Sequence, residues 1–134
     1  MVQEREAKLT FPKKEKLKSR KAIEALFSGG NKIKSYPVML VWKKNEHSCG
    51  NPLKIGVSVS KRKVRKAVNR NRIKRLMREA YRLNQSALVG MLPENNKLHL
   101  DVMFIYADSE IPTYAIIETK IKLLLDRLIK DLNQ

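Results

Sequence analysis

"AVNRNRIKRLMREAYRL", residues 67–83, carries six arginines and lysines against one glutamate and keeps an apolar residue at nearly every helical turn. Successive residues of an α-helix are about 100° apart. One arc of this helix would therefore hold Asn69 together with Ile73, Leu76, Met77, Ala80 and Leu83. The opposite arc would hold Arg70, Asn71, Lys74, Arg75, Arg78 and Arg82, with Arg72 and Glu79 at the border. The pattern predicts a helix over 66–83 that is apolar towards a sheet and cationic on its other side.

The segments on either side of this helix have the pattern of β-strands. In LKIGVSVS, residues 53–60, every second side chain is apolar, and the other face carries Lys54, Gly56, Ser58 and Ser60. LHLDVMFIYA, residues 98–107, is a nearly continuous apolar run, which is typical of a central strand covered on both faces. Strand, helix and strand together predict a βαβ unit in which the basic helix connects two parallel neighbours.

The remaining segments complete an α+β domain. SRKAIEALFSGG, residues 19–30, predicts a first helix, and YPVMLVW, residues 36–42, predicts a strand that a hairpin loop over 43–52 joins to the next one. A last helix over 114–132 would pack on the sheet through Ile117, Ile121, Leu124, Leu125, Leu128 and Leu132. We therefore expect a two-layer α/β sandwich.

The length and the charge of the chain define its class. Its 134 residues are enough for one domain, so we expect a single unit over 1–134 with a flexible N-terminus at 1–10. The net charge is +16 and 43% of the residues are hydrophobic, which is the composition of a folded, strongly basic protein and not of a disordered tail.

Most of the net positive charge is concentrated in the middle of the chain. Residues 61–82 contain eleven lysines and arginines and one acid. Five of these cations lie in the loop KRKVRK before the helix: Lys61, Arg62, Lys63, Arg65 and Lys66. The single acid, Glu79, lies at helical spacing from Arg75 and Arg82 and is expected to pair with one of them. Because a face kept only for solubility interleaves both signs, loop and helix predict a surface for a polyanion, without distinguishing RNA from DNA.

Catalytic, metal and membrane sites receive no support from the sequence. His47 and Cys49 share a turn-rich loop but fall short of the roughly four ligands of a structural zinc. The acids are scattered, as Asp101, Glu118 and Asp126 illustrate, so we predict no protein-borne catalytic or metal site. No apolar run approaches the roughly 18 residues of a transmembrane helix, and the start lacks a signal-peptide pattern. We expect a cytoplasmic protein with no membrane partner.

The strand, loop and helix at the centre of the chain resemble a known family. VSVSKR, residues 57–62, followed by AVNRNRIKRLMREAYR, residues 67–82, is similar to the signature of the protein component of bacterial ribonuclease P. FPKKEKLKSRKAIEALFSGG, residues 11–30, resembles the opening of the same family, and the resemblance extends to about residue 130. It implies a ribosomal-protein-like domain with a central mixed sheet, in which the basic helix is a left-handed crossover against the usual right-handed rule.

The resemblance also implies a function and two binding surfaces. Members bind a large catalytic RNA and with it remove the 5′ leader of precursor tRNA, while the RNA and its Mg²⁺ ions perform the hydrolysis. The catalytic RNA would contact the loop cations and Arg70, Asn71, Arg72, Lys74, Arg75, Arg78 and Arg82. The single-stranded leader would lie in a cleft formed by Lys16, Ile23, Phe27, Val41, Gly56, Ser58 and Ser60.

Two features of the chain depart from the family pattern. Members commonly have a Gly-Asn pair shortly before Ala-Val, where this chain has Arg65-Lys66 and one extra residue. Ile23 and Val41 stand where aromatic rings are usual, which leaves as substitutes Phe27, Tyr36 and Trp42. Phe27 and Trp42 either contact the leader or pack in the core.

Other functions are compatible with the composition. The main alternative is a ribosomal or general RNA-binding protein with no role in cleavage. A nucleoid DNA-binding protein would need a helix that enters the major groove with base-reading side chains, whereas this helix is expected to pack on a sheet. We expect the free protein to be a monomer whose partners are the catalytic RNA and precursor tRNA.

Overall fold

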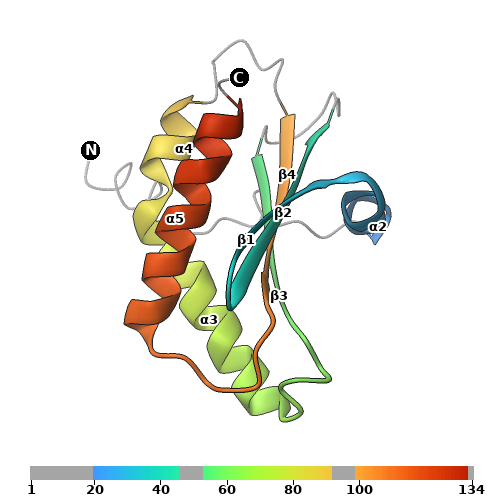
Figure 1. Ribbon diagram of the computed structural model, residues 1–134. Helices are drawn as coiled ribbons and strands as arrows, with labels where there is room; N and C mark the ends of the chain where they lie inside the picture. Colours follow the sequence, from blue (N-terminus) through green and yellow to red (C-terminus); the bar gives the residue numbers. More distant parts are fainter. Residues whose placement is uncertain (1–19, 46–52, 92–98, 133–134) are drawn as a thin grey trace, which may run out of the picture.

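A computed structural model describes residues 20–45, 53–91 and 99–132. Its elements, in chain order, are α2 (Arg20–Gly29), β1 (Asn31–Ser35), β2 (Val38–Asn45), β3 (Leu53–Val59), α3 (Ala67–Asn84), α4 (Ser86–Met91), β4 (His99–Tyr106) and α5 (Tyr114–Leu132). Figure 1 shows a four-stranded sheet with helices packed on it. The predicted α+β class is confirmed.

β4 lies inside the sheet, whose strand order is β1-β2-β4-β3. It pairs antiparallel with β2 and parallel with β3, and β1 pairs antiparallel with β2. The parallel register runs from Leu53 opposite Leu100 to Val59 opposite Tyr106. The sheet is therefore mixed, and the predictions of a central last strand and of a βαβ unit that contains the basic helix are confirmed.

Two short elements were not predicted, and one predicted connection is wrong. β1 buries a single side chain, Ile33, which is too little for an alternating pattern to be visible, and α4 has only six residues. The hairpin predicted over 43–52 is wrong because β4 separates β2 from β3. The hairpin instead joins β1 to β2 through Tyr36 and Pro37.

The main core lies between the sheet and the helices α3 and α5. Phe104 of β4 is fully buried, and its ring meets that of Tyr81 with centroids 6.0 Å apart and planes inclined by 49°. α5 packs through the predicted stripe, in which the buried side chains are Ile117, Ile121, Leu124, Leu125 and Leu128. Leu132 is partly buried against the same core. The prediction for this helix is confirmed at both ends.

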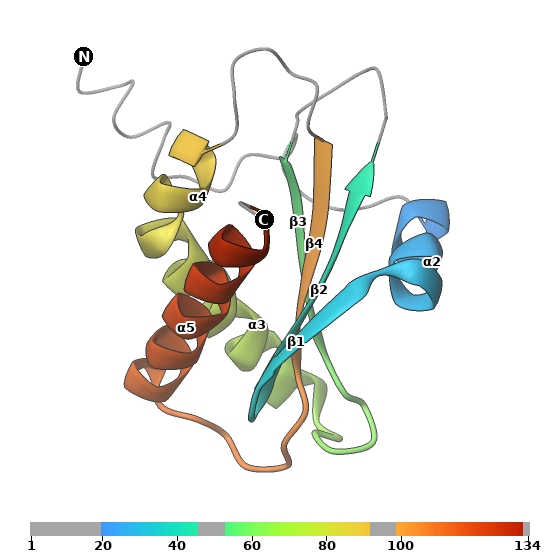
Figure 2. The ribbon, with the colours of Figure 1, turned by 45° about the horizontal axis from the view of Figure 1, so that its top comes forward.

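α2 covers part of the opposite face of the sheet (Figure 2). Its Leu26 is fully buried against Val41 of β2 and Met103 of β4. The chain leaves the helix at Gly30, where a Cβ would lie 2.4 Å from the carbonyl oxygen of Leu26 and 2.9 Å from Cγ1 of Val41. Only a residue without a side chain permits this approach, so the glycine holds α2 close to β2.

The buried arc of α3 differs from the predicted one. Its centre is near Met77, which is fully buried with Ile73, Ala80 and Tyr81. Leu76 is only partly buried against the core, and Leu83, predicted to face the sheet, is 47% exposed. The error has a physical cause, because the ring of Tyr81 is a large apolar surface despite its hydroxyl group. Counting it as apolar rotates the buried arc away from Leu83.

Tyr106 links the end of β4 to the loop that follows. Its side chain is 1% exposed, and its hydroxyl donates a hydrogen bond of 2.6 Å to the carbonyl oxygen of Glu110. Burial, with a smaller contribution from nearby Asp108, raises the pKa of Tyr106 to about 12. A raised pKa of this kind contributes stability that is complete below the unfolded value near 10 and is lost as the pH rises through the folded value.

We expect Tyr106→Phe to lower the free energy of unfolding by about 1 kcal/mol at pH 7, because one buried hydrogen bond is lost. The difference between the two proteins should shrink between about pH 10 and pH 12, since only the parent loses the contribution of the protonated phenol. Urea unfolding at a series of pH values measures both effects. A difference that stayed constant up to pH 12 would contradict the assignment.

Candidate nucleic-acid interface

The basic loop between β3 and α3 is fixed by its one apolar residue. Val64 is buried, and its amide donates to the carbonyl oxygen of Ser60 at 2.9 Å. The amide of Ser60 in turn donates to Tyr106 of the central strand at 3.3 Å. With Val64 turned inward, the cations on either side are exposed: Lys61, Arg62, Lys63, Arg65 and Lys66. The loop thus presents five positive charges from a defined backbone.

Arg70 fastens this loop to the first turn of α3. Its Nη1 donates to the carbonyl oxygens of Val64, at 2.9 Å, and of Arg65, at 2.7 Å. Lys66 precedes the helix without a capping hydrogen bond from its side chain, and the guanidinium of Arg70 ties the loop backbone to the first turn of the helix. The sequence placed Arg70 on the contact face, whereas in the structure its guanidinium contacts the protein's own backbone.

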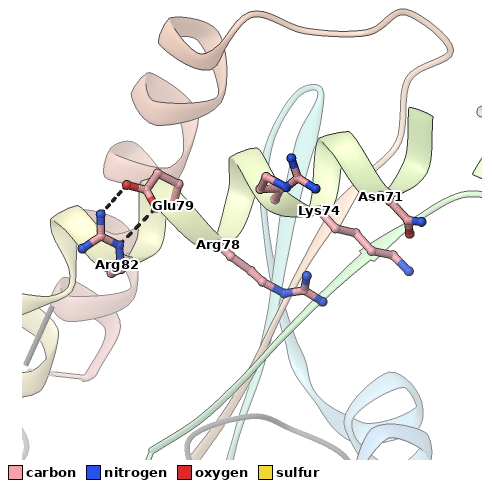
Figure 3. Close-up of a pocket in the computed structure, with 6 residues that line it drawn as sticks. Asn71, Lys74, Arg78, Glu79 and Arg82 are labelled. Carbon is pink, nitrogen blue, oxygen red and sulfur yellow. Dashed lines mark hydrogen bonds and ion pairs between the residues drawn. The ribbon is translucent and has the colours of Figure 1, made fainter. Parts of the chain in front are cut away.

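All the other predicted helix residues except Arg72 come together in a shallow depression of about 400 Å³. Its lining consists of Asn71, Lys74, Arg75, Arg78, Glu79 and Arg82. Figure 3 shows Asn71, Lys74 and Arg78 extending from one side of α3, with Glu79 and Arg82 turned the other way. We call Asn71, Lys74, Arg75 and Arg78 the cationic row. Arg72 is also exposed, outside this lining.

Glu79 and Arg82 form an ion pair at one end of the depression. Arg82 donates from Nε to Oε2 of Glu79 at 3.1 Å, and from Nη2 to Oε1. These hydrogen bonds, more than the accompanying charge attraction, hold the pKa of Glu79 below its ordinary value. The expected pairing of Glu79 within the helix is confirmed, with Arg82 as the partner.

Beyond this pair lies Glu118 of α5, whose carboxylate has three neighbouring partners. The hydroxyl of Tyr114 donates to Oε2 of Glu118 at 3.1 Å, and the side-chain amide of Asn84 approaches the same oxygen at 3.4 Å. Lys122 lies 4.0 Å from the other carboxylate oxygen. Burial raises the pKa of Tyr114, and its hydrogen bond to Glu118 adds to the effect. Next to the cationic row, α5 therefore contributes a carboxylate that is paired with a lysine, and no excess of cations.

A second surface lies on the face of the sheet that α2 only partly covers. Gly56 and Ser58 of β3 pair in register with Met103 and Ile105 of β4, so their side chains share this face. Met103 is buried beneath Leu26, while Gly56, Ser58 and Ile105 remain half-buried. Among the described residues, a strip of small and apolar residues is left open between α2 and the outer edge of β3.

The residues predicted for the leader cleft differ in exposure. Phe27 is 44% exposed and so lies outside the core, whereas Trp42 is buried in it. Val41 is fully buried beneath Leu26 and lines no open surface, which corrects its predicted place in the cleft. Ser60 is half-buried, as Ser58 is. Two further predictions, Lys16 and the side chain of Ile23, lie outside the described part of the chain.

Residues 20–45, 53–91 and 99–132 contain neither a metal-ligand cluster nor a helix that could span a membrane. In these ranges no three side chains of His, Cys, Asp or Glu converge as metal ligands would. The loop with His47 and Cys49 falls outside them. None of the helices within them combines the length and the apolar character needed to cross a bilayer.

Known proteins match this chain over most of its length. The family model described as Ribonuclease P matches residues 11–129. The ribonuclease P protein component of Porphyromonas gingivalis is 34% identical over 116 residues, which covers 87% of this chain and 84% of that protein. The same component from Geotalea uraniireducens is 44% identical over 79 residues, covering 59% of this chain and 66% of that protein.

Solved structures share the fold. The Staphylococcus aureus RNase P protein superposes with a TM-score of 0.65 at 21% identity, covering 85% of this chain and 94% of that one. The Thermotoga maritima RNase P protein gives a TM-score of 0.63 at 24% identity, with coverages of 84% and 96%. Sequence and fold agree with the resemblance of the strand, loop and helix, and the chain belongs to the ribonuclease P protein family.

Proposed function

We propose that this chain binds the catalytic RNA of ribonuclease P through α3 and the loop before it, and holds the 5′ leader of precursor tRNA on the open strip of the sheet. In this way it assists the Mg²⁺-dependent endonucleolytic removal of the leader. The observation that carries the proposal is the depression on α3, where three cations and an asparagine of the cationic row converge beside a loop with five more.

The cationic row suits a folded RNA backbone. Arginine forks can each grip a phosphate through two parallel hydrogen bonds, while lysine contributes a point charge and asparagine both a donor and an acceptor. The row belongs to a helix that is anchored in the core by Met77 and Tyr81. Phosphates would therefore meet side chains on a rigid support, which favours one register of binding.

The open strip suits a single strand. Gly56 has no side chain and Ser58 has a small one, so an extended chain can approach the backbone of β3 closely. Exposed Phe27 on α2 offers a ring on which one base can stack, an interaction typically of about 1–3 kcal/mol. In this proposal the leader and the catalytic RNA occupy different faces that meet near the edge strand β3.

The protein's own part is to bind and to orient. Mg²⁺ belongs to the catalytic RNA in this proposal, where it supplies the activated water and stabilises the leaving oxygen. The cations of α3 and its loop lower the repulsion between RNA strands that must come together. The open strip adds binding energy only when a leader is present, and so favours precursor over mature tRNA.

The test is cleavage of a precursor tRNA by the catalytic RNA of the same genome at low Mg²⁺, with and without the protein. We expect strong stimulation, no cleavage by the protein alone, and tighter binding of precursor than of mature tRNA. Phe27→Ala should reduce that preference while leaving binding of the catalytic RNA intact. RNA binding without any stimulation would overturn the proposal and indicate a general RNA-binding protein.

A further inference from the structure

The only acid in the basic segment 61–82 is Glu79, and it faces the depression that the cationic row lines. An acid at this place weakens the attraction of the surface for phosphates. Glu79 forms an ion pair with Arg82, which lies three residues later on the same helix (Figure 3). The effect of Glu79 is therefore concentrated on one arginine.

The ion pair occupies the part of Arg82 that would otherwise bind RNA. Nε and Nη2 form one edge of the guanidinium fork, and both donate to the carboxylate of Glu79. The same edge is one that a phosphate would occupy in a bidentate contact. The side chains remain accessible, with 29% of Arg82 and 44% of Glu79 exposed. Arg82 thus lies within reach of RNA, but Nε and Nη2 are engaged by Glu79.

On the side nearer α5, cations no longer outnumber acids. Tyr114 and Asn84 direct their polar atoms to the carboxylate of Glu118, and Lys122 lies 4.0 Å from its other oxygen. A phosphate that moved past the cationic row would meet this second acid together with its lysine. The excess of cations along α3 therefore ends at the Glu79–Arg82 pair.

We propose that Glu79 is a positioning residue that ends the RNA contact on α3, because it holds the fork of Arg82 away from the phosphates. This inference rests on the proposed RNA-binding function. The number of phosphates contacted determines the sequence-independent part of the affinity. A surface that contacts one phosphate fewer binds any RNA less tightly. The cationic row still selects the RNA whose backbone matches it.

The experiment compares the parent with Glu79→Gln, Arg82→Gln and the double variant. The probe is a single-stranded oligouridine, and the readout is the slope of the logarithm of the binding constant against the logarithm of the salt concentration. Glu79→Gln should steepen the slope by about 0.7, the value for one more phosphate on a single strand, and should raise the affinity about fourfold near 0.15 M salt. Arg82→Gln and the double variant should both keep the slope of the parent.

Asp131→Asn is the matched control. It changes the net charge by the same amount, and the residue is exposed near the far end of α5, about 25 Å along the helix from Tyr114 at 1.5 Å per residue. We expect the parent slope from it. Thermal unfolding of every variant verifies that the fold is retained.

Two outcomes would overturn the inference. An unchanged slope in Glu79→Gln would show that the released arginine finds no phosphate, and a shallower slope in Arg82→Gln alone would show that Arg82 already binds one. Both are read from binding by a parent that does bind RNA, so they are distinct from a failure to stimulate cleavage. A parent that bound no RNA would overturn the proposed function and this inference together.

Discussion

Replacing Lys74, Arg75 and Arg78 by alanine is expected to weaken binding of the catalytic RNA about 100-fold near 0.15 M salt and to reduce the salt slope by about two to three. These side chains line the depression on α3, and none of the three is buried in the core. Alanine is the strongest helix former, so the helix should persist. Filter binding or fluorescence anisotropy at four or more salt concentrations gives both quantities.

The matched control for this variant removes three lysines of α5, Lys120, Lys122 and Lys130, and so the same charge from another helix. We expect it to lower the affinity far less and to leave the slope nearly unchanged. Arg70 is excluded from the test set because its bonds to the loop backbone would mix loss of contact with loss of loop order. Equal effects of the two triple variants would show that only net charge matters.

Met77→Ala is expected to lower the free energy of unfolding by about 2–5 kcal/mol, the usual cost of removing a fully buried side chain of this size. Met77 is completely buried at the centre of the arc that α3 turns towards the sheet. Urea unfolding monitored by circular dichroism measures the loss. The cationic row lies on another side of the helix, so RNA affinity should stay close to that of the parent wherever the variant is folded.

Leu83→Ala on the same helix is the comparison, since this leucine is 47% exposed. Its cost should stay below about 1 kcal/mol, as for other surface positions. Leu76, which is partly buried, should fall between the two. A larger loss for Leu83 than for Met77 would place the buried arc where the leucines alone predict it.

Long periodic segments of this chain can be predicted from sequence, and short ones cannot. α5 repeats its apolar residues over five turns, and the sequence of β3 alternates over seven residues. Each pattern therefore fits only one type of secondary structure. β1 and α4 have five and six residues, and their form depends on the neighbours they pack against. Tyr81 shows a further limit, because the sequence does not indicate whether a tyrosine ring faces the core or the solvent.

The candidate site was predictable in composition but not in its internal bonds. The cations of α3 and its loop are visible in the sequence, and most of them are exposed in the structure. The role of Arg70 could not be foreseen, because it depends on the path that places two loop carbonyl groups within its reach. The burial of Val41 and Trp42 could not be foreseen either. It depends on which helix packs over each face of the sheet: Val41 lies under α2, and Trp42 belongs to the core on the face of α3 and α5.

The strand order also has a consequence for the way the chain is made. β2 and β3 both pair with β4, which is the last strand to be synthesised. Until it emerges from the ribosome, the described segments can form the local hairpin of β1 and β2, but β3 has no strand beside it. Pairing of β4 between them closes long loops, and contacts between residues far apart in the sequence slow folding. A nascent chain that stops before residue 99 would present its basic helix without a completed sheet to hold it.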